Sequence, residues 1–122
     1  MKEITAIIRS NRIQKTKDAL AAAGFPQITV KDVLGLGKQR GLQHEFCHEL
    51  PEPADGEEFP GVSFIPKRMV TLVAADNEID KLVDLIIKVN QTGNVGDGKI
   101  IVSPVGNALR IRTGESGQAA LL

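Results

Sequence analysis

The sequence lacks tyrosine and tryptophan, and Cys47 is its single cysteine. One cysteine excludes an internal disulfide, so a disulfide-stapled secreted scaffold is not expected. Its four aromatic residues are all phenylalanine, which argues against an RNA-binding sheet, because such sheets stack bases on exposed aromatic rings. No apolar run is long enough for a membrane span or a signal peptide. We therefore expect a cytoplasmic protein that neither binds nucleic acid nor inserts into membranes.

The chain also lacks an overall charge of either sign. It has 15 Lys and Arg against 15 Asp and Glu in 122 residues, which gives no bulk attraction to nucleic acid or anionic lipid. Residues 44–58 nevertheless hold six acidic residues and no Lys or Arg. This acidic stretch suits docking to a basic partner surface, or it serves to keep an exposed loop soluble. The sequence leaves both interpretations open.

Hydrophobic periodicity predicts a single domain over residues 1–122 with the order β-α-β, long loop, β-α-β. The pattern predicts helices that start near residues 13 and 79 and end by Gly24 and Gly93, with Asn11 and Gln14 as a capping box for the first and Asp76 or Asn77 as the cap of the second. Strands are predicted at 2–9, 28–36, 69–75 and 100–105, with a possible short fifth strand at 109–113. This order predicts an α+β, ferredoxin-like fold. Two helices cover one face of such a sheet, so oligomerisation is expected to bury the other face.

Residues 44–48 read HEFCH, which matches the H-E-x-x-H of zinc peptidases. That chemistry needs a long helix and a third ligand. The two prolines at 51 and 53 leave too short a helix, and the chain has no third histidine. A looser zinc site of His44, Cys47 and His48 remains a distant alternative to a solvated loop.

The stretch 93–100, GNVGDGKI, resembles a phosphate-binding P-loop. It lacks the Ser or Thr that holds magnesium, and it leaves a helix to enter a strand, the reverse of a P-loop. Its glycines and Lys99 suit an anion-binding nest, while a plain helix-to-strand turn explains them equally well.

Two arginines lie close together further on. Arg110 and Arg112 flank Ile111, so on an extended segment both would point to one side and suit phosphate or carboxylate. An ordinary strand with a charged outer face is the alternative. Gln39 and Lys67 bracket the long loop.

Four stretches together resemble the PII nitrogen-signalling family: TAIIR at 5–9, ITVKDVLGLGKQRG at 28–41, TGNVGDGKI at 92–100 and RIRTGE at 110–115. The resemblance spans nearly the whole chain except residues 42–64. It implies a trimer with nucleotide sites in the clefts between subunits, where ATP and ADP compete and 2-oxoglutarate joins Mg-ATP. It implies a ligand-gated regulator and not an enzyme, with a target-binding T-loop at about 37–66 and a C-terminal loop at about 107–122.

The resemblance also implies roles for individual residues. The implied nucleotide-binding residues are Thr29, Gly35, Gly37, Lys38, Gln39, Val73, Gly96, Asp97, Gly98, Lys99, Arg110 and Arg112. For 2-oxoglutarate they are Gln39, Lys67 and Gly96, and Gln39 would complete the Mg²⁺ shell.

Departures from the family pattern narrow the function. The missing tyrosine excludes control by uridylylation of a T-loop tyrosine, and Ile101 replaces the usual aromatic residue. The long loop and the flanking stretches at 11–26 and 65–69 resemble the nitrogenase-associated branch, which implies a homotrimer or a hetero-oligomer with a PII-like paralogue and dinitrogenase as the target. A general PII protein that regulates ammonium transport or nitrogen-assimilation enzymes is the alternative.

Overall fold

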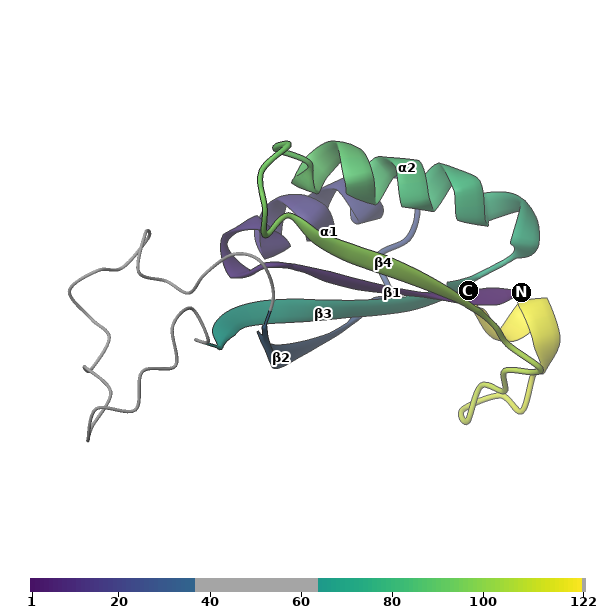
Figure 1. Cartoon of the computed structure of the whole chain (residues 1–122). Coiled ribbons are helices and arrows are strands. Elements are labelled where there is room, and N and C mark those ends of the chain that lie inside the picture. Colours follow the sequence, from purple (N-terminus) through teal and green to yellow (C-terminus); the bar gives the residue numbers. More distant parts are fainter. Residues whose placement is uncertain (37–63, 122) are drawn as a thin grey trace, which may run out of the picture.

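A four-stranded antiparallel sheet with two helices on one face forms the described part of the molecule (Figure 1). The computed structural model describes residues 1–36 and 64–121. The strands are β1 (Lys2–Arg9), β2 (Thr29–Gly35), β3 (Ile65–Ala74) and β4 (Gly98–Pro104). Their order across the sheet is β2-β3-β1-β4, which confirms the predicted ferredoxin-like α+β fold.

Strand β1 lies at the centre of the sheet and pairs with both β3 and β4. At one end of β1, Arg9 stands opposite Lys67 of β3 and Ile8 stands opposite Gly98 of β4. We call this the loop end, because the connection from helix α2 (Ile79–Asn90) to β4 and the connection from β2 to β3 both meet the sheet here. At the other end, Lys2 stands opposite the last residues of β3 and β4. We call this the tail end.

The core lies between the sheet and the two helices, α1 (Ile13–Ala22) and α2 (Ile79–Asn90). Alternate residues of β1 and β3 face the helices because side chains along a strand point to opposite faces in turn. The fully buried side chains include Ile4, Ile8, Leu20, Val70, Leu82 and Ile86. A polar bridge also joins the helices. The buried Asn90 Nδ2 donates to Thr16 Oγ1 at 3.0 Å and to the Ile86 carbonyl at 2.9 Å.

Both helices start differently from the sequence prediction. Each is preceded by a short 3-10 turn, Ser10–Arg12 before α1 and Asp76–Glu78 before α2, and neither start has a side-chain cap. The capping box of Asn11 and Gln14 was therefore wrong, since Gln14 Nε2 instead donates to Asp18. The Asp76 cap was also wrong, because this carboxylate lies 2.9 Å from the N-terminal amine.

The last predicted strand, 109–113, does not form. A single bridge joins Leu109 to Ser116, and residues 111–113 make a turn. The turn is closed by a 2.7 Å hydrogen bond from the Gly114 N–H to the Arg110 carbonyl, with Gly114 at φ 73°. The expectation that Arg110 and Arg112 project from one side of an extended segment was therefore wrong.

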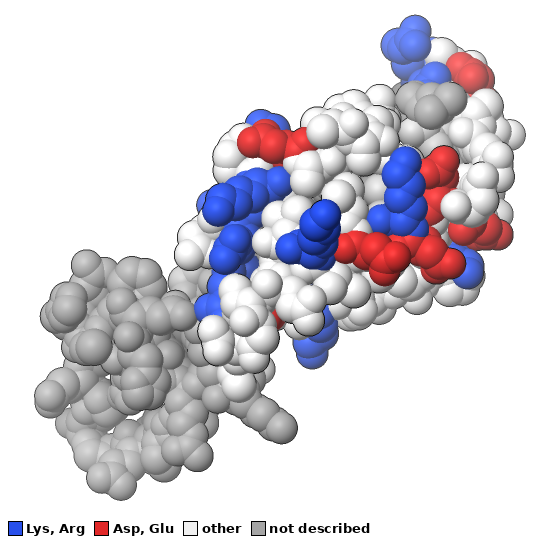
Figure 2. All heavy atoms as spheres, turned by 90° about the horizontal axis from the view of Figure 1, so that it is seen from above, with Lys and Arg blue, Asp and Glu red and all other residues white. Residues whose placement is uncertain are grey.

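The two faces of the sheet differ in the elements that pack against them. The helix side carries Lys and Arg side chains among Asp, Glu and uncharged ones, as expected for a solvated surface (Figure 2). Neither α1 nor α2 covers the opposite face (Figure 1), and the 3-10 helix Gly117–Leu121 meets the sheet only at the tail end. That face carries Ile7, Met69, Thr71 and Ile101, and Ile101 is 47% exposed. The chain therefore leaves an apolar sheet surface that a partner can bury.

Gly98 approaches β1 so closely that a side chain there would clash. Its φ is 113°, and a Cβ would lie 1.9 Å from the carbonyl oxygen of Ile7. We expect Gly98→Ala to lower the free energy of unfolding by about 2–5 kcal/mol, because left-handed strain and a backbone clash combine. Urea unfolding followed by circular dichroism measures the change. Gly106→Ala, where a Cβ would meet nothing within 4 Å, is the matched control, and equal stability of the two variants would contradict the close approach.

Candidate functional site

The loop 92–99 runs from just beyond α2 into the first two residues of β4 at the loop end of the sheet, and glycines shape its turns. Gly93, Gly96 and Gly98 have φ values of 85°, 101° and 113°. This left-handed region is open to glycine without strain. Positive φ values alone fit an anion nest and an ordinary turn equally well, so the contacts of the loop decide between them.

Asp97 stabilises this loop through hydrogen bonds to other residues of the loop. Its Oδ2 accepts hydrogen bonds from the N–H groups of Thr92 (2.8 Å) and Gly93 (2.9 Å), and its Oδ1 accepts one from the Thr92 hydroxyl. The Thr92 hydroxyl lowers the pKa of Asp97 to about 2, helped by the two N–H groups and Arg9 and opposed by burial. The carboxylate is therefore ionised at neutral pH, and its oxygens face the loop.

Two cations hold the carbonyl groups of the same loop. Arg9 Nη2 donates to the Val95 carbonyl at 2.9 Å and lies 3.4 Å from Asp97 Oδ1. Lys67 Nζ donates to the Gly96 carbonyl at 2.7 Å. In a trans peptide the C=O and the following N–H point in opposite directions. The N–H groups of Gly96 and Asp97 therefore point away from these cations, an arrangement that can hold an anion.

Strand β2 ends beside Lys67. A Cβ at Gly35 would lie 3.2 Å from Lys67 Cγ, so glycine leaves room for the lysine stem. The other predicted residues of this region, Gly37, Lys38 and Gln39, lie outside the described residues, as do His44, Cys47 and His48. Within residues 1–36 and 64–121, no group of three His, Cys, Asp or Glu could hold a metal ion.

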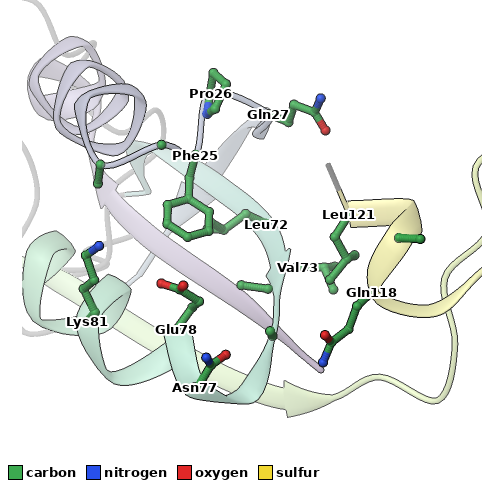
Figure 3. Close-up of a pocket in the computed structure, with 15 residues that line it drawn as sticks. Phe25, Pro26, Gln27, Leu72, Val73, Asn77, Glu78, Lys81, Gln118 and Leu121 are labelled. Carbon is green, nitrogen blue, oxygen red and sulfur yellow. The ribbon is translucent and has the colours of Figure 1, made fainter.

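A hollow of about 780 Å³ opens at the tail end. Figure 3 shows the Phe25 ring lying beside Leu72, with Val73, Gln118 and Leu121 along another side of the hollow. Strand β2 begins at Thr29, opposite Thr71, so the edge of β3 beyond that point has no strand partner from β2. An apolar hollow beside a free strand edge can take a flat ring with polar edges.

The two arginines belong to the C-terminal segment, and Arg110 contacts a residue that lines this hollow. Arg110 Nη1 donates to Glu115 Oε1 and its Nη2 to the Ala119 carbonyl, both at 3.2 Å. Ala119 belongs to the 3-10 helix Gly117–Leu121, which lines the hollow. Arg112 is exposed. The structure thus fixes one arginine and leaves the other open to solvent.

The predicted anion-binding residues fall into two groups at opposite ends of the sheet. Lys99 is the second residue of β4, at the loop end, and Arg110 and Arg112 follow the strand beyond the tail end. The seven residues of β4 span about 23 Å. One chain therefore does not bring Lys99 and the arginines to the same ligand.

Sequence reasoning missed Arg9 and Thr92, and it grouped Asp97 with the ligand contacts. The signal in the sequence for Thr92 and Arg9 was Asp97, because a partly buried carboxylate needs hydrogen-bond donors and a cation close by. Which residues supply them depends on the strand register, and the sequence does not reveal that register.

Comparison with known proteins identifies the relatives of this chain. The family model described as "Nitrogen regulatory protein P-II" matches residues 1–115. The chain belongs to the P-II family. Two proteins named "Nitrogen fixation nifHD region GlnB-like protein 2" are similar to it along its length. The one from Methanothermobacter marburgensis (strain Marburg) is 46% identical over 121 residues, covering 99% of this chain and 100% of that protein. The one from Methanobacterium ivanovii is 45% identical over 122 residues and covers both chains fully.

A solved P-II structure shares the fold. The crystal structure of Arabidopsis thaliana PII bound to citrate matches with a TM-score of 0.74 and 30% identity, covering 98% of this chain and 88% of that one. Together these relatives confirm the predicted P-II family and its nitrogen-fixation-associated branch. P-II proteins are nitrogen regulators, as the sequence predicts for this chain. No helix in the described ranges has the length and apolar character needed to cross a membrane.

Protonation of Asp97 should weaken the fold in acid. Because its pKa is lowered to about 2 from about 3.9 in an unfolded chain, the ionised group stabilises the fold above pH 4, and this contribution disappears as the pH falls through 2. We expect Asp97→Asn to be less stable than the parent at pH 6 and the difference to shrink towards pH 2. Urea unfolding at pH 6, 4 and 2.5 measures it, and a stability difference that does not change with pH would contradict the assignment.

Proposed function

We propose that this P-II family chain senses ATP, ADP and 2-oxoglutarate and reports the ligand state to a target protein through the T-loop at about 37–66. The observation that supports the proposal is that two sets of suitable groups lie at the two ends of the sheet. The loop end supplies outward-facing N–H groups and Lys99, which suit phosphates. The tail end supplies a hollow and two arginines.

Each nucleotide site is then shared between two copies of the chain. Gly96, Gly98 and Lys99 of one copy bind the phosphates, and Arg110 and Arg112 of a neighbour reach the same triphosphate. The neighbour's Thr29 and Val73 contact the adenine at the free edge of β3. The uncovered face of the sheet supplies the surface for a trimer, and a hetero-oligomer with a P-II paralogue would use the same surface. We further propose that residues 1–122 form one domain, with residues 65–66 of the T-loop lying within β3.

Lys67 links the second ligand to the first. Its ammonium already lies at the glycine loop, 2.7 Å from the Gly96 carbonyl. The distal carboxylate of 2-oxoglutarate pairs with this lysine, as an ammonium suits a carboxylate. Gly35, Gly37 and Lys38 form the base of the T-loop, so both ligands bear on it.

Magnesium joins the site with ATP and 2-oxoglutarate. Mg²⁺ prefers oxygen ligands, which the phosphates, 2-oxoglutarate and the amide oxygen of Gln39 provide. A similar P-II structure holds citrate, another carboxylate, which supports small carboxylates as ligands of this fold. These metabolites are cytoplasmic, so the sensor works in the cytoplasm as a regulator without catalytic activity of its own.

Dinitrogenase is the proposed target. The support is that two relatives, similar along the full chain, are named for the nifHD region. A role as a general P-II protein acting on ammonium transport or on nitrogen-assimilation enzymes is the second candidate, supported by the family match itself. Affinity capture from a nitrogen-fixing extract, with and without 2-oxoglutarate and ATP, separates these two targets.

Substituting Lys67 should uncouple the two ligands. We expect 2-oxoglutarate with Mg²⁺ to tighten ATP binding by roughly tenfold in the parent and to have no effect in Lys67→Ala. ATP alone should bind the variant within about threefold of the parent, because Arg9 and Asp97 still hold the loop. Isothermal titration calorimetry measures both, with Lys15→Ala on the exposed side of α1 as the control. Equal 2-oxoglutarate dependence in variant and parent would remove Lys67 from this role, and a parent that ignores millimolar ATP would refute the proposed function.

A further inference from the structure

We propose that the Arg9 guanidinium and the Asp97 carboxylate are a positioning pair for the phosphates. They touch no ligand themselves, and they hold the loop 92–99 so that the N–H groups of Gly96 and Asp97 face the anion. The inference rests on the nucleotide-binding function proposed above. It gives the Asp97 side chain an indirect role in binding.

The contacts of Asp97 point inward. Both of its oxygens accept hydrogen bonds from Thr92 and its neighbour Gly93, and the side chain is 22% exposed. An anion would also repel a phosphate at short range. The carboxylate is therefore suited to closing the loop, because its hydrogen bonds join Thr92 at the start of the loop to Asp97 near its end.

Arg9 comes from a distant part of the chain and acts on the same loop. Its side chain is 16% exposed, and Nη2 bridges the Val95 carbonyl and Asp97 Oδ1. The guanidinium offsets the charge of the carboxylate, which reduces its repulsion of a phosphate. It also links the loop to the end of β1, so the sheet determines the position of the loop.

The glycines explain why the conformation of the loop needs stabilising contacts from other side chains. Gly96 and Gly98 allow the positive φ values of this turn, and the same freedom lets the peptides beside Gly96 rotate at little cost. A rotation of the Val95–Gly96 peptide would turn its N–H inward and remove one donor from the anion site. The hydrogen bond from Arg9 to the Val95 carbonyl opposes that rotation. The hydrogen bond from Lys67 to the Gly96 carbonyl opposes the same kind of rotation of the Gly96–Asp97 peptide.

The test separates phosphate binding from base binding. ATP and adenosine affinities are measured for the full-length parent, Arg9→Met, Asp97→Asn and the double variant, by calorimetry for ATP and by competition for adenosine. We expect each single variant to bind ATP about tenfold more weakly and adenosine within about twofold of the parent, since adenosine has no phosphate to position. The double variant should be little weaker than either single variant, because the two residues act as one unit.

Two further variants keep the test decisive. Arg68→Met removes another arginine–carboxylate pair of the sheet, 2.6 Å from Asp32, and should leave ATP affinity unchanged. Arg9→Lys keeps a cation that can reach the Val95 carbonyl, so it should lose less ATP affinity than Arg9→Met, and it carries the comparison if Arg9→Met does not fold.

Three results would overturn the inference. If the ATP and adenosine affinities fall together, the variants damage the site in general. If Arg9→Met and Asp97→Asn leave the ATP affinity unchanged, the loop does not need these side chains to hold its conformation. If the losses in the double variant are additive, the two residues act separately. A parent that binds no ATP at all would instead refute the proposed function.

Discussion

The pairing of β1 with β3 on one side and β4 on the other is the constraint on which the rest of this structure depends. Its register places Arg9, Lys67 and Gly98 together at one edge of the sheet. Two cations from different strands can therefore reach the carbonyl groups of a single loop. A slip of one residue would turn Arg9 to the helix side and move Ile8 out of the core. The hydrophobic pattern of β1 therefore also fixes the position of the loop 92–99.

The same sheet places the two groups of candidate ligand-binding residues at its opposite ends. The outward-facing N–H groups of Gly96 and Asp97 lie where β4 begins, and the hollow and the arginines lie where β4 ends. Under the proposed function, a ligand that needs both groups binds between copies and therefore reports on the assembly. The chain from β2 to β3 departs from the loop end, beside Lys67. Ligands at that end thus lie next to the segment proposed to meet the target.

Local patterns predicted much of the fold. The strand predicted at 2–9 has those bounds in the structure. The helical spacing of Ile79, Leu82, Val83, Ile86 and Ile87 predicted one buried face of a helix. Ile79, Leu82 and Ile86 are buried, whereas Val83 is half-buried and Ile87 is 42% exposed. The strand at 109–113 failed because Gly114 closes a turn that alternation does not reveal. The capping predictions failed because neither helix start has a side-chain cap, and Gln14 and Asp76 contact other groups, Asp18 and the N-terminal amine. For the site, motifs indicated Lys99 and Asp97, but the role of Arg9 depends on pairing across the whole sheet.

A mixing experiment tests the shared site most directly. Lys99→Ala chains and Arg110→Ala chains, each prepared alone, lack one half of every site and should bind ATP weakly. Unfolded together and refolded in equal amounts, they should regain parent-like affinity at about one quarter of the sites, the random chance that an interface joins two intact halves. No recovery on mixing, or full ATP binding by either variant alone, would contradict a site built from two copies of this chain.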